Sequence, residues 1–214
     1  MADIAINNSE ACDLFIEHGN SHNTTGLETK LTAAPGNIAI WILIYAEFTE
    51  FGLFFLAFLI AKVHNPEVFF QGPTQLNTLA GMANTLVLLT SSFFVANAIK
   101  SIKSGNRKAC LTWLYLTLLC GTAYLGIKAW EYDWNQAAGI HSRGNLFFSI
   151  YYYLTFNHWL HVAMGMSVIS WVTFRLHFYA YDADNHESLE SAASYWHMID
   201  IVWIIIFPLL YVVR

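Results

Sequence analysis

The chain has 214 residues, of which 56% are apolar and only 12% are charged, and its formal net charge at pH 7 is −5. A globular domain usually carries about 25% charged residues, so this composition excludes a disordered chain and argues against a soluble globular one. The negative charge excludes a nucleic-acid binder, and the three cysteines are too few for a disulfide-stapled secreted scaffold. The composition is typical of an integral membrane protein.

Five apolar runs are long enough to cross the hydrocarbon layer of a bilayer, which takes about 20 residues in a helix. Their length favours helices over a barrel, whose strands would alternate over about 10 residues. We therefore predict an all-α integral membrane bundle of five transmembrane helices over residues 38–214, preceded by a polar tail over residues 1–37. The predicted spans are Ile38–Ala61, Leu76–Ile99, Cys110–Trp130, Leu146–Tyr179 and Ala193–Val213, the last with a kink at Pro208.

The distribution of basic residues predicts the orientation of these spans. The tail has no basic segment followed by an apolar core, so we do not expect it to be a cleaved signal peptide. With five spans, six basic residues fall on the side of the N-terminus: Lys30, Lys100, Lys103, Arg107, Lys108 and Arg175. Three fall on the opposite side: Lys62, Arg143 and Arg214. The positive-inside rule then places the tail in the cytoplasm and the C-terminus on the outer side of the membrane.

The first predicted span carries two carboxyl groups, Glu47 and Glu50, which lie three residues apart and therefore on one helical face. Phenylalanines surround both of them. Because ionisable groups are costly in hydrocarbon, each is a candidate functional group. Glu47 either holds or passes a proton, or pairs with another helix and fixes the packing. For Glu50 the packing interpretation is favoured.

The second and third predicted spans carry polar groups that favour a structural role. Asn84 stands among small and hydroxyl residues, which let helices approach and hydrogen-bond to one another. Lys128 and Glu131 lie three residues apart near the end of the third span. They can pair with each other, or their side chains can reach back to the membrane interface.

The fourth and fifth predicted spans contain histidines at helical spacing. His158 and His161 share one face of the fourth span, and His197 and Asp200 share one face of the fifth. Histidine and aspartate together occur in proton relays and behind metal ligands. Hydrogen bonds between helices explain the same residues, and we favour that interpretation.

Two other functions are alternatives to this structural interpretation. A free-standing membrane enzyme would build a di-metal centre from Glu47, Glu131, His158, His161 and His197. Helical di-iron sites usually carry a Glu-x-x-His motif on two helices, and this sequence has none. A small proton-coupled transporter is disfavoured because the sequence lacks the inverted repeats and broken helices of that class. The cysteine spacing resembles no zinc or thiolate–copper site.

Six short motifs follow one another from about residue 35 to the C-terminus. In chain order they are Glu47 with Phe54-Phe55-Leu-Ala-Phe58, Asn84-Thr85-Leu-Val-Leu-Leu-Thr-Ser91, Glu131-Tyr132, Phe147-Phe148, His158-x-x-His161-Val162-x-x-Gly165 and Tyr195-Trp196-His197-x-x-Asp200-x-Val202-Trp203. With these motifs in this order, the chain resembles subunit III of the haem–copper oxidases. The last motif is the most specific of the six.

Seven-helix members of that family have two more helices at the N-terminus, so the chain is more similar to the five-helix members. These are subunit III of bacterial quinol oxidases and the subunit III-like protein encoded with nitric oxide reductase. Three further stretches resemble the latter most closely: Pro35-Gly36-Asn37-x-x-x-Trp41, Asn65-Pro66-x-x-Phe69 and Glu187-Ser-x-Glu190-Ser-Ala-Ala-Ser-Tyr195-Trp196-His197.

The resemblance implies a non-catalytic subunit of a respiratory terminal oxidase or nitric oxide reductase. It also implies a bacterial inner membrane, in which the C-terminus would lie in the periplasm. Such a subunit has no cofactor of its own, and its partner, the catalytic subunit, carries haem and copper or iron. The resemblance also implies support for assembly, stability and proton uptake, with phospholipid bound in a cleft between helices. Glu47 falls at the position of the family's carbodiimide-reactive carboxyl group. The remaining polar residues are expected to pack between helices: Asn84, Glu131, His158, His161, His197 and Asp200.

Overall fold

The structure is a computed structural model that describes residues 37–178 and 187–213. These residues belong to one compact unit, Pro35–Arg214. Of the predicted polar tail over residues 1–37, only Asn37 lies within the described part. The predicted end of the fourth span at Tyr179 lies outside it.

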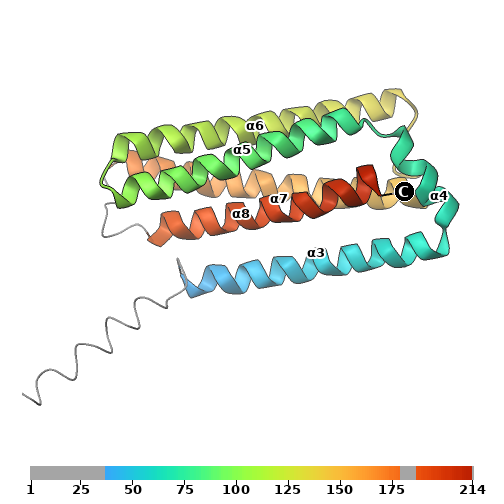
Figure 1. Cartoon of the computed structure of the whole chain (residues 1–214), viewed down its shortest axis with the longest axis horizontal. Coiled ribbons are helices and arrows are strands. Elements are labelled where there is room, and N and C mark those ends of the chain that lie inside the picture. Colours follow the sequence, from blue (N-terminus) through green and yellow to red (C-terminus); the bar gives the residue numbers. More distant parts are fainter. Residues whose placement is uncertain (1–36, 179–186, 214) are drawn as a thin grey trace, which may run out of the picture. The chain divides into compact units, whose positions relative to one another are not determined.

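The described residues form helices and contain no strand, which confirms the predicted all-α class. Five of the helices are long, and a short helix and a 3₁₀ turn connect the first of them to the second (Figure 1). In chain order the elements are α3 (Ile38–His64), α4 (Pro66–Gln71), the 3₁₀ helix η1 (Gly72–Gln75), α5 (Thr78–Lys103), α6 (Arg107–Ala137), α7 (Leu146–His177), α8 (Glu187–Phe207) and the π-helical turn η2 (Pro208–Val212).

Asparagine caps and glycine stops explain where several helices begin and end. In each of four long helices the residue before the first turn is an asparagine whose side-chain oxygen accepts a hydrogen bond from a backbone amide of that turn. These caps are Asn37, Asn77, Asn106 and Asn145. Gly105 and Gly139 follow α5 and α6 with φ angles of 72° and 78°, a conformation that glycine adopts without strain.

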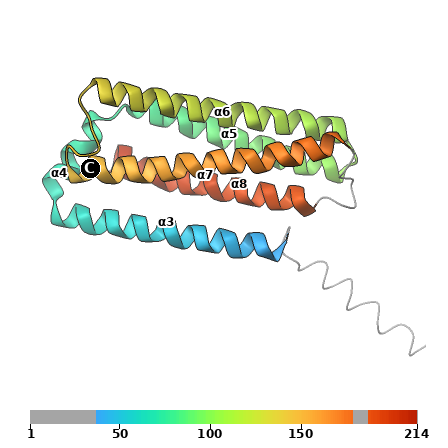
Figure 2. The same cartoon turned by 180° about the vertical axis from the view of Figure 1, so that it is seen from behind.

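Four of the long helices, α5 to α8, pack together as a bundle in which α5 and α6 form the most extensive pair. The first helix, α3, lies along α8 and α7 with far fewer contacts, and it stands to one side in both views (Figures 1 and 2). The centre of the bundle is lined by α8, whose Trp196 and Trp203 are fully buried. Polar residues on α3 therefore meet the bundle mainly across α7 and α8.

Four helices are long and apolar enough to cross a membrane: α3, α5, α6, and α8 continued through η2. With 32 residues α7 has sufficient length, but its tyrosines, histidines and asparagine keep it below the mean hydropathy of the other four. The described residues thus give four candidate spans by length and composition, where the sequence predicted five.

The structure also corrects the predicted boundaries. The connection over residues 66–75 is helical, because Pro66 and Pro73 favour the first turn of a helix and Phe69 is buried beneath it. The third span continues from the predicted Trp130 to Ala137, and the fifth begins before the predicted Ala193, at Glu187. The predicted interruption at Pro208 is confirmed, since α8 ends at Phe207 and the chain continues as a π-helical turn.

Candidate functional site

A carboxyl–imidazole contact joins α3 to α7. Glu47 projects from α3, and its Oε2 lies 2.7 Å from Nε2 of His161 on α7. The other ring nitrogen of His161, Nδ1, lies 2.8 Å from the backbone oxygen of Asn157, one turn earlier on the same helix. The ring of Phe51 packs edge-on against His161 with 5.2 Å between ring centroids. Both side chains of the pair are only 12% exposed.

These two distances restrict where the protons of the pair can be. A backbone oxygen can only accept, so Nδ1 of His161 must carry a hydrogen and donate it to Asn157. The short contact between Nε2 and Glu47 then holds one hydrogen, which belongs either to a protonated carboxyl group or to a protonated imidazole. In both arrangements the pair has no net charge. Such a pair can hold a proton at low cost inside an apolar bundle.

A second polar contact lies one turn away along the same two helices. The side-chain amide of Asn157 donates to Oε1 of Glu50 at 2.9 Å, in an exposed position. Together with the contact of Glu47, this bond fixes how α3 rests against α7. The geometry at Glu50 agrees with the favoured packing interpretation.

The largest polar cluster surrounds a buried ion pair on α6, Lys128 with Glu131, and is called the lysine cluster below. Lys128 Nζ lies 3.1 Å from Oε2 of Glu131, and neither side chain is exposed. The lysine also donates to the hydroxyl groups of Tyr211 (2.7 Å) and Tyr151 (3.2 Å). Both hydroxyl groups donate in turn to Oε1 of Glu131, at 2.5 and 2.7 Å. Four aromatic rings lie 5.0–5.5 Å from the ammonium group: Tyr132, Tyr151, Trp203 and Tyr211.

This cluster decides between the two predictions for Lys128. The residue pairs with Glu131, and the alternative in which it reaches back to the membrane interface is wrong. The physical reason is that Tyr151 on α7 and Tyr211 in η2 complete its hydrogen bonds inside the bundle. Neither tyrosine was predicted as a partner from the sequence, although a tyrosine within an apolar run is a signal for a buried hydroxyl partner.

Three hydrogen bonds join α5 to α8. Ser92 Oγ lies 2.7 Å from Nδ1 of His197, and at the same turn the Trp196 indole donates to Ser91 at 3.0 Å. About two turns away on both helices, Trp203 donates to Thr85 at 3.0 Å. The hydroxyl residues of the second predicted span thus bond to a neighbouring helix.

Three predicted site residues are buried without a hydrogen-bond partner among the described residues. They are Asn84 (0% exposed), His158 (0%) and Asp200 (3%). Although His197 and Asp200 share a helical face, the described residues show no hydrogen bond between them, and His197 turns to Ser92 instead. His158 lies among aromatic rings, separate from the contact made by His161.

The structure distributes the residues of the hypothetical di-metal centre over four different surroundings. Glu47 bonds to His161 between α3 and α7, and Glu131 belongs to the lysine cluster. His158 packs among aromatic rings, and His197 bonds to Ser92 of α5. Within residues 37–178 and 187–213, no three His, Cys, Asp or Glu side chains come close enough to hold a metal ion. This arrangement does not support the di-metal hypothesis.

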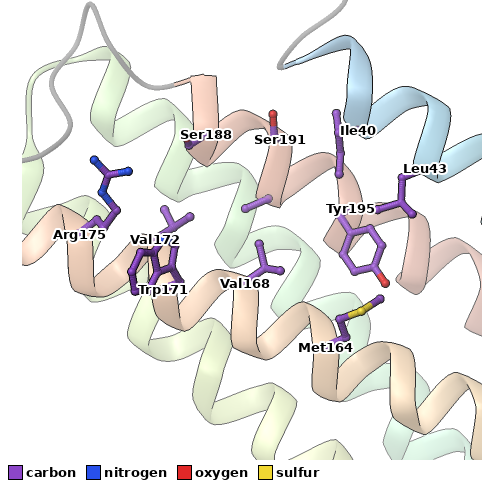
Figure 3. Close-up of a pocket in the computed structure, with 11 residues that line it drawn as sticks. Ile40, Leu43, Met164, Val168, Trp171, Val172, Arg175, Ser188, Ser191 and Tyr195 are labelled. Atoms are coloured by element: carbon purple, nitrogen blue, oxygen red, sulfur yellow. The ribbon is translucent and has the colours of Figure 1, made fainter.

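An apolar groove of about 300 Å³ runs between α3, α7 and α8 (Figure 3). Arg175 and Ser188 lie toward one end of it, and Met164 and the ring of Tyr195 lie toward the other. The rest of the lining is mainly aliphatic and aromatic: Ile40, Leu43, Val168, Trp171, Val172 and Ala192.

These features define a multi-pass membrane protein whose intramembrane polar groups largely bond between its own helices. The profile of the family described as cytochrome c oxidase subunit III matches residues 15–213. The chain therefore belongs to the cytochrome c oxidase subunit III family, as its motifs predicted. It is a non-catalytic subunit III of a haem–copper oxidase complex, and the subunits of this family generally have no redox cofactor of their own.

Two relatives illustrate the match. The chain is 30% identical over 176 residues to "Cytochrome c oxidase subunit 3" of Thermostichus vulcanus, covering 82% of this chain and 86% of that protein. It is 27% identical over 195 residues to "Probable quinol oxidase subunit 3" of Staphylococcus aureus strain USA300, covering 90% of this chain and 96% of that protein. Neither name refers to nitric oxide reductase, so the predicted subgroup stays a prediction.

Proposed function

We propose that the chain packs against the haem-containing catalytic subunit of a respiratory complex in a bacterial inner membrane, where it supports assembly, stability and proton uptake. One observation carries this proposal. Four ionisable groups of the long helices form two pairs within the chain, Glu47–His161 and Lys128–Glu131, while the outer faces are apolar. The apolar outer faces of such a chain can pack against the catalytic subunit, which carries out the redox chemistry.

The proposed topology has five crossings, with α7 as the fourth of them. A helix of 32 residues is about 48 Å long, which exceeds the thickness of the hydrocarbon layer. Because α7 packs along both α6 and α8, it crosses the membrane with them. The basic connection between α5 and α6 then lies in the cytoplasm with the N-terminal tail, and the C-terminus lies in the periplasm.

The proposed functional carboxyl group is Glu47. The support is its contact with His161, in which two nearly buried groups share a hydrogen without a net charge. In this role Glu47 holds a proton within the membrane domain and reacts with hydrophobic carbodiimides. The other site residues act in helix packing: Asn84, Glu131, His158, His161, His197 and Asp200.

We also propose a phospholipid in the groove between α3, α7 and α8. The apolar lining suits an acyl chain, and the side chains of Arg175 and Ser188 lie toward one end of the groove, where a headgroup would lie. In the proposed topology this end faces the cytoplasm, so the lipid belongs to the inner leaflet.

Oxygen and nitric oxide are both candidate substrates of the partner. The nitric oxide alternative is favoured by two motifs that resemble the protein encoded with nitric oxide reductase. They meet in space, since the backbone amide of Asn37 donates to Oγ of Ser191 at 3.0 Å. Measuring oxygen and nitric oxide consumption by the purified complex distinguishes the two substrates.

A direct test of the accessory role is to express the chain alone in a host that lacks its partner. The purified chain should show no Soret absorbance and no stoichiometric iron or copper. Bound metal near one equivalent per chain, lost in a His158→Gln or His197→Gln variant, would overturn the proposal in favour of a free-standing metal enzyme.

A further inference from the structure

Two fully buried polar side chains lie together between α6 and α7 without hydrogen-bond partners. The ring of Tyr124 on α6 stands edge-on to the ring of His158 on α7, with 5.7 Å between their centroids. Neither side chain is exposed. The hydroxyl group of Tyr124 and both ring nitrogens of His158 have no partner among the described residues. Buried polar atoms in proteins almost always have one, so this group of three atoms calls for an explanation.

The rings around these atoms cannot supply the missing hydrogen bonds. Trp203 of α8 lies 5.3 Å from Tyr124 and 5.1 Å from His158, but its indole group already donates to Thr85. Phe51 of α3 also packs against His158, at 6.4 Å, and offers neither a donor nor an acceptor. The three atoms are therefore enclosed by aromatic surface from two other helices.

The two side chains do not satisfy each other, since no hydrogen bond joins them among the described residues. A neutral imidazole has one donor and one acceptor nitrogen, and a phenol hydroxyl group can both donate and accept. A water molecule can accept from one of these groups and donate to the other, and a water buried in a protein makes about three such bonds to groups that are otherwise unpaired.

We propose that Tyr124 and His158 bind an ordered water molecule inside the helix bundle. The water accepts from the hydroxyl group of Tyr124 and donates to the acceptor nitrogen of His158. The site adjoins the lysine cluster, because Lys128 lies one helical turn from Tyr124 and its ammonium group is 5.5 Å from the same Trp203 ring. It extends the polar interior of the bundle along α6 and α7, from Lys128 to Tyr124 and from Tyr151 to His158.

The first test is a map of the intact complex at a resolution that shows ordered water at other buried sites. The proposal predicts a peak at hydrogen-bonding distance, about 2.7–3.2 Å, from the Tyr124 hydroxyl and a ring nitrogen of His158. An empty map at this position or a direct Tyr124–His158 bond would overturn it. A peak with neighbours at about 2.0–2.1 Å, the length of a zinc–nitrogen bond, would overturn it too.

The second test uses matched tyrosine variants of the complex. Tyr124→Phe should remove the peak and reduce magnetisation transfer from water to the ¹⁵N-labelled ring of His158 several-fold. Tyr132→Phe is the control, because its hydroxyl group already donates to Thr155 at 2.9 Å, and it should leave both signals unchanged. An unchanged peak in Tyr124→Phe would contradict the proposal. If the Tyr124→Phe variant does not assemble, the presence or absence of the water peak in the map of the wild-type complex decides the question.

Discussion

Lys128 and Glu131 form an ion pair of 3.1 Å in the interior of the helix bundle, with both side chains inaccessible to solvent. The pair is completed by two tyrosines, Tyr151 from α7 and Tyr211 from the π-helical turn η2. Side chains of three elements, α6, α7 and η2, thus meet at one buried salt bridge. Because Tyr211 lies beyond the interruption at Pro208, the cluster also fixes the C-terminal turn to α6.

We predict that breaking this buried pair on one side is much more destabilising than removing both charges. Lys128→Met leaves a buried carboxylate without its cation and should lower the free energy of unfolding by about 3–5 kcal/mol. Adding Glu131→Gln should recover a large part of that loss. Lys103→Met is the control, since Lys103 is 52% exposed in its pair with Glu190 and should contribute less than about 1 kcal/mol. Equal losses for the buried and the exposed lysine in thermal unfolding would refute the prediction.

The contact of Glu47 with His161 predicts that hydrophobic carbodiimides modify Glu47 selectively. Hydrophobic carbodiimides partition into the membrane and react with protonated carboxyl groups, so Glu47 should be modified in preference to the acids of the tail and loops. Glu47→Gln should abolish the adduct in mass spectra of the digested protein yet leave the complex assembled. Glu50→Gln serves as the control and should retain the adduct. Modification spread evenly over the exposed acids would argue against a proton held at Glu47.

Replacing the imidazole of His161 should have a modest effect on the stability of the protein. A hydrogen bond between helices in a membrane contributes about 0.6–2 kcal/mol, so His161→Gln should destabilise the protein by that amount and still permit assembly. The unfolding midpoint of the purified complex measures this effect. Complete loss of an activity with unchanged stability would instead assign His161 a chemical role.

The connection between α5 and α6 tests the proposed orientation. In a variant without the native cysteines, a cysteine at position 104 should resist a membrane-impermeant thiol reagent added to intact cells. A cysteine at position 141, in the connection between α6 and α7, should be labelled. Labelling at position 104 alone would invert the topology.

A tight contact at Gly72 predicts a strong effect of one methyl group. A Cβ atom at this position would overlap the ring of Phe147, whereas a Cβ atom at Gly52 would meet nothing within 4 Å. Gly72→Ala should therefore destabilise the protein by about 1–3 kcal/mol through overpacking. Gly52→Ala should be neutral or stabilising, because alanine favours the helix. A smaller side chain in Phe147→Leu should restore part of the stability of Gly72→Ala, as measured by thermal unfolding.

Local features of the fold were predictable from the sequence, because they depend on neighbouring residues. The apolar runs predicted the long helices, Asn37 stands where the first of them begins, and Pro208 marks the end of α8. The boundaries were less predictable, since α8 begins with polar residues at Glu187 that carry no signal of a membrane span. The short helix α4 depends on the burial of Phe69, which the sequence does not reveal.

The partners of the polar residues were beyond the reach of sequence reasoning. Helical spacing places His158 and His161 on one face, yet one of them packs among rings and the other bonds to Glu47. Spacing likewise paired His197 with Asp200, while the packing of α8 against α5 brings His197 to Ser92. Periodicity determines the face of a helix, and the packing of helices distant in sequence determines which group meets it.

The most direct test of the central claim, that this chain is an accessory subunit of a haem-containing complex, is purification through an affinity tag from its native membrane in mild detergent. The preparation should contain a second, larger subunit in about equal amount, and its spectrum should show a Soret band that belongs to that subunit. Recovery of the tagged chain alone, without haem and with undiminished stability, would contradict the account.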